Sequence, residues 1–134
     1  FDRNLSETLL RRIDEVAQGI ASAFRGSAET CEIVSAPPLH NDGAMLDLST
    51  ACAQELFGDA SVYRLREGGM GSEDFASYTY ELPCAYLLLG AGTAQEDPRY
   101  GKPMHNPQVV LNEDILPRGA ALHTLTALRY LERT

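Results

Sequence analysis

The sequence predicts an α/β fold, in which helices pack on a sheet that contains parallel pairs of strands. After residue 43 the expected elements follow the order helix, strand, helix, strand, helix, which is typical of such folds. The near-continuous apolar run over residues 84–89 has the length and character of a central strand buried on both faces. Only two or three strands are expected in total, so the sheet resembles part of a larger one.

The first 43 residues predict one helix, one strand and a hinge. Residues 1–25 show the charge and spacing of an amphipathic helix that ends at Gly26, and its apolar stripe comprises Leu5, Leu9, Ile13, Val16, Ile20 and Phe24. Residues 29–35 alternate as a strand does. Residues 37–43 are rich in proline and polar side chains, which favours a hinge and a domain boundary there.

The remaining elements alternate between helix and strand. A helix is expected over residues 44–57, with an inward face of Met45, Leu48, Cys52 and Leu56. A short strand over residues 62–66 is followed by a helix that begins with Ser72 as N-cap. The last helix is expected over residues 117–132, with an inward face of Ala121, Leu122, Leu125 and Leu128.

Composition narrows the class of protein. The 134 residues fit one domain or parts of two, and the formal net charge of −8 argues against nucleic acid or an anionic membrane as partner. No apolar run approaches the roughly 20 residues that span a bilayer. The three cysteines are widely spaced in apolar surroundings and form no CxxC pair, which predicts reduced, buried thiols in a cytoplasmic protein; they are Cys31, Cys52 and Cys84.

His105 is the first candidate for chemistry. It lies in a long polar loop over residues 90–112, between Pro103 and Pro107, whose rings restrict the backbone. A stiffly held imidazole suits a metal site or an acid/base site, but a loop histidine satisfied by backbone groups is an equally good interpretation. The sequence holds no local metal motif, and a thiol dyad with Cys84 is disfavoured because an apolar strand would raise the thiol pKa.

A glycine-rich turn followed by two acidic residues is the second candidate. Gly71 and Ser72 precede Glu73 and Asp74 at the start of the expected short helix. Bare backbone N–H groups at a helix N-terminus bind anions or a polarised carbonyl. The acidic pair has two interpretations: it stabilises the helix dipole, or one carboxylate orients a ligand or substrate. The spacing matches neither dinucleotide-binding nor P-loop motifs.

Four segments in order resemble one known family. Residues 71–75, 87–90, 104–107 and 116–123 are similar to the C-terminal part of the metal-dependent amidohydrolases of the aminoacylase/carboxypeptidase family. The most similar branch contains hippurate hydrolase, N-acyl-amino-acid amidohydrolases and auxin-conjugate hydrolases. The resemblance implies two domains. Residues 1–40 would be the second half of a ferredoxin-like lid, and residues 41–134 the C-terminal part of a zinc-peptidase-like α/β catalytic domain.

The resemblance also implies a chemistry. In the full-length enzyme, two divalent metal ions (zinc or manganese, with cobalt or nickel as alternatives) would activate water to cleave the amide bond of a small N-acyl amino acid. His105 would be a metal ligand, Gly71 and Ser72 would line the substrate pocket, and Glu73 and Asp74 would support the ligands or the structure. The general base and the other ligands would lie upstream of Phe1. The isolated chain would then be inactive and hold no metal tightly.

The expected lid domain also suggests how this chain would associate with other chains. The resemblance implies a homodimer or higher oligomer formed through the lid domain. A different class of function stays open at this stage: a non-catalytic oligomerisation or binding module. Its strand over residues 29–35 would pair edge to edge with a partner.

Overall fold

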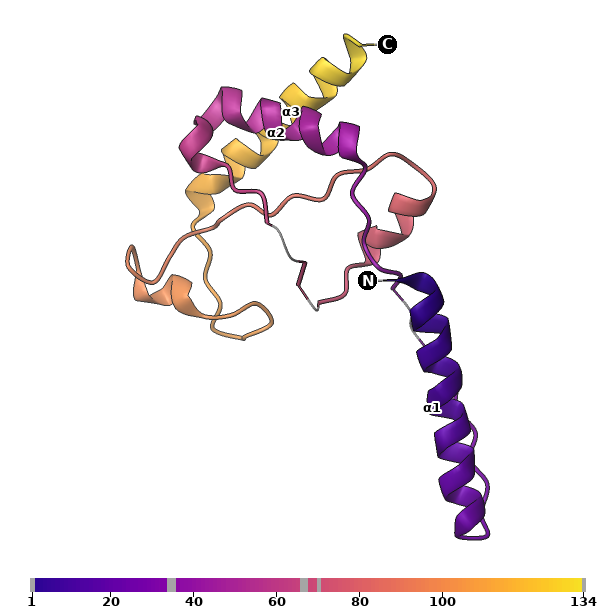
Figure 1. Ribbon diagram of the computed structural model, residues 1–134. Helices are drawn as coiled ribbons and strands as arrows, with labels where there is room; N and C mark the ends of the chain where they lie inside the picture. Colours follow the sequence, from indigo (N-terminus) through magenta and orange to yellow (C-terminus); the bar gives the residue numbers. More distant parts are fainter. Residues whose placement is uncertain (1, 34–35, 66–67, 70, 134) are drawn as a thin grey trace. The chain divides into compact units, whose positions relative to one another are not determined.

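The computed structural model describes residues 2–33, 36–65, 68–69 and 71–133, and all regular secondary structure within them is helical. Figure 1 shows the three α-helices, which are α1 (Arg3–Ala23), α2 (Gly43–Phe57) and α3 (Leu116–Leu131). Four short 3-10 helices accompany them: η1 (Asp59–Ser61), η2 (Asp74–Tyr80), η3 (Pro98–Gly101) and η4 (Glu113–Ile115). None of the described helices has the length and apolarity needed to cross a bilayer.

The chain divides into two compact units. The first contains residues 1–41 and 67–84, and the second contains residues 42–66 and 85–134. The predicted domain boundary after residue 40 stays a prediction, since each unit is built from two separate segments of the chain.

The predicted α/β fold is wrong, because the described residues contain no strand. The described parts of the three expected strands, residues 29–33, 62–65 and 84–89, have no regular secondary structure; residues 34–35 and 66 lie outside the described part. An apolar or alternating pattern becomes a strand only where another segment supplies ladder hydrogen bonds and covers its faces. Within the described chain no segment does this for residues 84–89, and Leu88 is 75% exposed.

Helix α1 is confirmed, and local backbone chemistry sets both of its ends. At the start, the Asp2 carboxylate accepts a hydrogen bond from the Asn4 N–H at 2.7 Å. At the end, Arg25 adopts a left-handed φ of 60° and the Gly26 N–H donates to the Ala21 carbonyl at 2.9 Å. This is the Schellman arrangement. The helix thus ends close to the predicted Gly26, and the left-handed residue at its end is Arg25.

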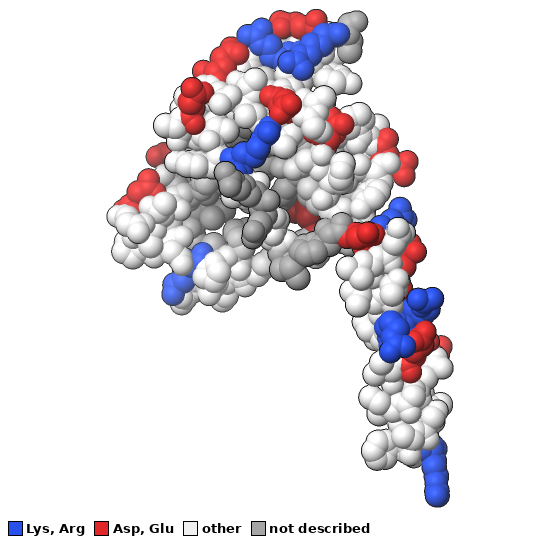
Figure 2. All heavy atoms as spheres, in the orientation of Figure 1, with Lys and Arg blue, Asp and Glu red and all other residues white. Residues whose placement is uncertain are grey.

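The surface of α1 combines ion pairs with an exposed apolar stripe. Figure 2 shows basic and acidic side chains next to one another along this helix, in agreement with the ion pairs Arg3–Glu7, Arg11–Glu15 and Arg12–Glu15. Such exposed pairs stabilise a helix by only about 0.3–0.5 kcal/mol each. The predicted stripe has helical spacing, yet each of its members is exposed in the first unit, from Leu5 to Phe24.

The remainder of the first unit is organised around η2. The Tyr80 hydroxyl donates to the Pro38 carbonyl at 2.8 Å, and the Thr79 hydroxyl oxygen accepts from the His40 N–H at 3.3 Å. Ala76, in the same helix, is fully buried. These contacts attach the hinge around residues 37–40 to η2.

In the second unit, α2 packs against α3, and four of its described residues are buried in α2. Asp42 caps α2 by accepting from the Met45 N–H at 2.9 Å. The Arg129 guanidinium of α3 reaches the Glu55 carboxylate of α2 at 3.1 Å. The buried residues of α2 are Leu48, Ser49, Cys52 and Ala53. Of the predicted inward faces, Leu48 and Cys52 are buried and Leu56 and Leu128 are exposed. The half-buried members are Met45, Ala121, Leu122 and Leu125.

The cysteines only partly match the prediction of buried thiols. All three are free, but Cys31 is exposed, Cys84 is half-buried and only Cys52 is buried. Cys31 lies in the segment that lacks the predicted strand, so no covering sheet removes its side chain from solvent.

Candidate functional site

The loop that carries His105 is held together by its own contacts. The Asn112 N–H donates to the Ala91 carbonyl at 2.9 Å and joins the two ends of the loop. Near one end, the ring of Tyr100 lies on Gly92, whose φ of 106° belongs to the region that favours glycine. Long structureless loops are usually mobile or functional, and this one is internally packed.

A second contact within the loop is electrostatic. Asp97 caps η3 and pairs with Arg99, whose guanidinium lies 2.6 Å from the carboxylate. The side-chain hydrogen bond from Arg99, followed by the bond from the Arg99 backbone N–H, lowers the pKa of the Asp97 carboxyl. The Asp97 carboxylate in turn raises the pKa of the Arg99 guanidinium. The ion pair between Asp97 and Arg99 thus stabilises η3, which ends four residues before His105.

His105 itself is exposed and has a left-handed backbone with φ of 64°. The next residue, Asn106, forms two short-range bonds: its side-chain oxygen accepts from the Gln108 N–H at 2.8 Å, and its carbonyl accepts from the Val109 N–H at 3.0 Å. The imidazole is accessible on a backbone that is fixed on its C-terminal side. The sequence motif indicated a stiff loop, but its two prolines did not reveal the left-handed residue or the role of Asn106.

The glycine–acid segment belongs to the first unit, whereas His105 belongs to the second. Glu73, not Ser72, is the N-cap of η2, and its carboxylate accepts from the Phe75 N–H at 3.2 Å. Asp74 is the first residue of η2 and is exposed, as are Gly71 and Ser72. A cap at Glu73 gives that side chain a structural task in the described chain.

The described residues do not by themselves fit a metal site. No group of three or more histidine, cysteine, aspartate or glutamate side chains among them is placed to hold a metal ion. A protein site for zinc takes at least three such ligands. His105 therefore offers one ligating side chain without co-ligands in the described chain.

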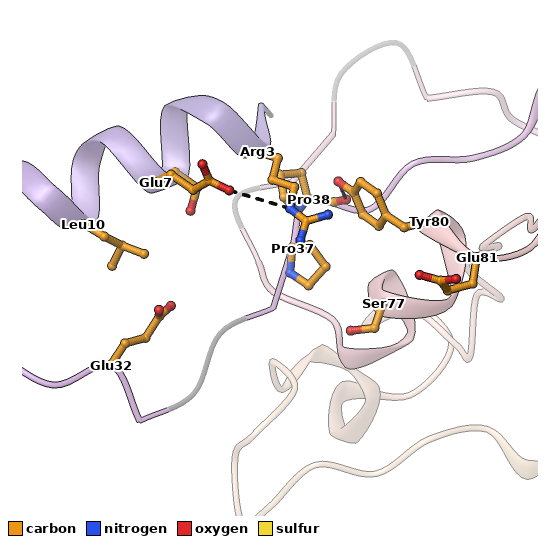
Figure 3. A pocket seen from close by; sticks show the side chains of 10 residues that line it. Arg3, Glu7, Leu10, Glu32, Pro37, Pro38, Ser77, Tyr80 and Glu81 are labelled. Carbon is orange, nitrogen blue, oxygen red and sulfur yellow. Dashed lines mark hydrogen bonds and ion pairs between the residues drawn. The ribbon is translucent and has the colours of Figure 1, made fainter.

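The described part of the first unit contains a cavity away from these residues. It has a volume of about 400 Å³ and is lined by residues of α1, the hinge and η2, none of which is a predicted site residue. In Figure 3 the Arg3 guanidinium lies between the Glu7 carboxylate and the Tyr80 ring, at 3.9 Å from the carboxylate and 5.5 Å from the ring centroid. Both contacts of the Arg3 guanidinium lie within the first unit.

A comparison with known protein families shows which family this chain belongs to. The family model for peptidase family M20/M25/M40 matches residues 12–129, which include every residue of the candidate site. The chain belongs to this family of hydrolases. No solved structure matches it.

Three relatives illustrate the breadth of the family. The chain is 31% identical over 130 residues to the hippurate hydrolase of Campylobacter jejuni, covering 97% of this chain and 31% of that protein. It is 36% identical over 95 residues to the IAA-amino acid hydrolase ILR1-like 6 of Arabidopsis thaliana (71% of this chain, 20% of that protein). It is 28% identical over 116 residues to the N-acetylcysteine deacetylase of Bacillus subtilis (87% and 28%). The chain thus spans less than a third of the length of these relatives.

Proposed function

We propose that this chain is part of a metal-dependent amidohydrolase that cleaves the amide bond of small N-acyl amino acids. The observation that carries the proposal is the family match over residues 12–129. The names of three relatives support the substrate class, since hippurate, an IAA-amino acid conjugate and N-acetylcysteine each join an acyl group to the nitrogen of an amino acid.

In this proposal His105 is a ligand to one of two divalent metal ions, zinc or manganese. Its exposure and its internally packed loop support this role, because a ligand must be accessible and held in place. The co-ligands and the general base are assigned to residues outside this chain, since the described residues hold no cluster of ligands. No catalytic step is assigned to this chain alone.

Gly71 and Ser72 line the substrate pocket in the same proposal, and Glu73 and Asp74 support the structure beside it. The exposure of Gly71 and Ser72 supports access by a substrate, and the cap formed by Glu73 supports a structural task. Assembly as a homodimer or higher oligomer through residues 1–40 and a cytoplasmic location complete the proposal.

The competing function, a binding module that pairs through a strand edge, has no supporting observation. It required a strand over residues 29–35, and the described residues 29–33 do not form one. Residues 34–35 lie outside the described part of the chain.

The test uses the longest natural polypeptide that contains this chain. Release of the free amino acid is measured with hippurate, N-acetylcysteine and an indole-3-acetyl amino acid as substrates, and bound metal is counted by mass spectrometry. His105→Ala is expected to lower kcat/KM by at least about 100-fold and to reduce the metal content. His123→Ala is the matched control, because His123 is an exposed histidine of α3 in the same unit.

Two results would overturn the proposal. Wild-type turnover and metal content in His105→Ala would remove the ligand assignment, and no turnover of any N-acyl amino acid by the parent polypeptide would remove the substrate class. Calorimetric titration of the 134-residue chain with zinc or manganese is expected to show no submicromolar binding, because one imidazole does not hold a metal tightly.

A further inference from the structure

We propose that the apolar stripe of α1 is an internal interface of the parent polypeptide, covered there by an apolar face of the same polypeptide outside residues 1–134. The stripe consists of Leu5, Leu9, Ile13, Val16, Ile20 and Phe24. This interface rests on the proposed function only in that the chain is a portion of a longer hydrolase. It does not depend on His105 or on a metal ion.

The stripe has the width of a helix face that packs on a globular core. At about 100° per residue its six side chains extend over about 100° of the helix circumference, and Leu10 widens this face to about 140°. Helices that pack on a core carry a stripe at least about 100° wide, whereas a helix that pairs in a coiled coil carries a narrower seam. In this chain the face is uncovered: the exposed fractions of the six range from 50% at Val16 to 84% at Phe24, and no residue of α1 is buried.

The chain itself covers a different side of α1. Residues 27–33 run back beside the helix (Figure 1), and the Thr30 hydroxyl donates to the Asp14 carboxylate at 2.6 Å. Asp14 follows Ile13 by one residue, so it lies about 100° round the helix from Ile13. Asp14 is half-buried, whereas Ile13 is 58% exposed. The returning segment therefore leaves the stripe uncovered.

The chain exposes more surface than a self-contained protein of its mass. Its 134 residues expose 11000 Å². A compact monomer of 14.6 kDa exposes about 7,000 Å², and two separate domains that share this mass expose about 8,000 Å² together. The difference of roughly 3,000 Å² is comparable to permanent interfaces, which bury about 2,000–5,000 Å². The stripe thus belongs to a surface that is large enough for a permanent interface.

An apolar face of the same polypeptide fits the stripe best. Arg12, at the margin of the stripe, pairs with Glu15 of the same helix, so the stripe presents an apolar surface without a free charge. The match to the hippurate hydrolase of Campylobacter jejuni leaves more than two thirds of that protein outside it, and residues in such a remainder can supply the covering face. A second copy of α1 fits less well, because two paired helices use a seam narrower than this face. Assembly of a homodimer through residues 1–40 would then use other surfaces of this unit.

The test measures the solvent exposure of the stripe in the longest natural polypeptide that contains this chain. Hydroxyl radicals oxidise exposed side chains, and mass spectrometry gives the oxidation rate at each residue from 5 to 24. Leucine and isoleucine in protein interiors are often more than 95% buried, so oxidation of the stripe is expected to be at least about tenfold slower in the parent polypeptide than in the 134-residue chain. The measurement is repeated on dilution while sedimentation reports the molecular mass, and the slow rate is expected to persist in the monomer.

Two variants of the parent polypeptide carry the same charge on different sides of α1. Ile13→Glu places a carboxylate in the stripe and is expected to lower the thermal midpoint by about 5 °C or more, because an unpaired charge is then buried. Thr8→Glu is the control, since Thr8 is exposed on the same helix and lies outside the stripe. Its thermal midpoint is expected to equal that of the wild type within about 1 °C.

Each outcome decides for or against the interface. Equal oxidation rates in the parent polypeptide and the 134-residue chain would overturn it, whether both are fast or both are slow. Protection that disappears when the parent polypeptide dissociates into monomers would identify a second copy as the occupant and would also overturn it. Equal thermal midpoints for Ile13→Glu and Thr8→Glu would show that the stripe stays in water.

Turnover of hippurate by the same preparation separates this interface from the proposed function. Turnover by a parent polypeptide whose stripe is oxidised rapidly overturns the interface alone. A protected stripe without turnover of any N-acyl amino acid removes the substrate class and leaves the interface in place.

Discussion

The ring of Tyr100 lies so close to Gly92 that a methyl group on Gly92 would be 2.5 Å from Tyr100 Cδ2. This contact joins the start of the His105 loop to the 3-10 helix η3 (Pro98–Gly101). Gly92 also has φ of 106°, which residues with a side chain rarely adopt. Glycine therefore both leaves room for the ring and allows this backbone conformation. The loop thus depends on a contact that only glycine allows.

Gly92→Ala is expected to destabilise the loop by about 1–3 kcal/mol, because the new methyl group meets both the ring and an unfavourable φ. Chemical denaturation and hydrogen exchange at residues 91–112 measure the effect. Gly90→Ala is the control, since a methyl group there meets no atom within 4 Å. Adding Tyr100→Ala to Gly92→Ala should recover the steric part of the loss only. Equal stability of the Gly92 and Gly90 variants would contradict the contact.

Leu48→Ala is expected to lower the free energy of unfolding by about 2–5 kcal/mol. Leu48 is 2% exposed and lies in the cluster between α2 and α3, so truncation leaves a cavity. Leu88→Ala should change the stability by less than about 0.5 kcal/mol, because Leu88 is 75% exposed. Urea denaturation followed by circular dichroism compares the two variants. Similar losses for both would show that the buried cluster is not where the second unit derives its stability.

Arg25→Gly is expected to stabilise helix α1 by about 1 kcal/mol, since glycine adopts the left-handed φ of 60° without steric cost. The Schellman hydrogen bonds use only backbone atoms and remain available in the variant. Arg25→Ala provides the comparison, because alanine keeps the steric cost. Helix content on heating, measured by circular dichroism, should rank glycine above arginine and alanine. A glycine variant no more stable than the alanine variant would argue against this cap.

Acid titration tests the ion pair between Asp97 and Arg99. The side-chain bond from Arg99, and then its backbone N–H, lower the pKa of the Asp97 carboxyl. Because the folded chain favours the charged form of the carboxyl more than the unfolded chain does, the ion pair stabilises η3 at neutral pH. That contribution is lost as the pH falls below the ordinary aspartate pKa of about 3.9. NMR titration should give Asp97 a lower midpoint in the wild type than in Arg99→Ala. The same Asp97 midpoint in both proteins would contradict the ion pair with Arg99.

The candidate site was predictable in part. The spacing of Pro103, His105 and Pro107 indicated a stiff loop, and the loop is indeed held by its own contacts. The Asn106–Pro107 pair carried a turn signal that could have indicated the Asx bond to Gln108. The left-handed φ of His105 had no such signal, because a proline restricts its own φ and the residue before it, and neither Pro103 nor Pro107 is next to His105.

The three α-helices and the family could be predicted from the order of residues along the chain. Helix hydrogen bonds join residues four apart in one segment, so spacing and caps suffice to place α1, α2 and α3 to within a few residues. Family membership likewise depends on the order of residues along the chain. A strand is different, because its hydrogen bonds must come from another segment. The apolar run over residues 84–89 therefore predicted a strand wrongly, because no described segment pairs with it.

The burial of particular side chains and the contacts that hold the His105 loop depend on how distant segments pack together. Cys52 is buried and Cys31 exposed, although both lie in apolar sequence, because α3 packs on α2 and no described segment covers Cys31. The contact of Gly92 with Tyr100 and the bond of Ala91 with Asn112 join residues eight and 21 positions apart. Such contacts arise when the backbone turns back on itself, and no periodic pattern along the chain encodes them.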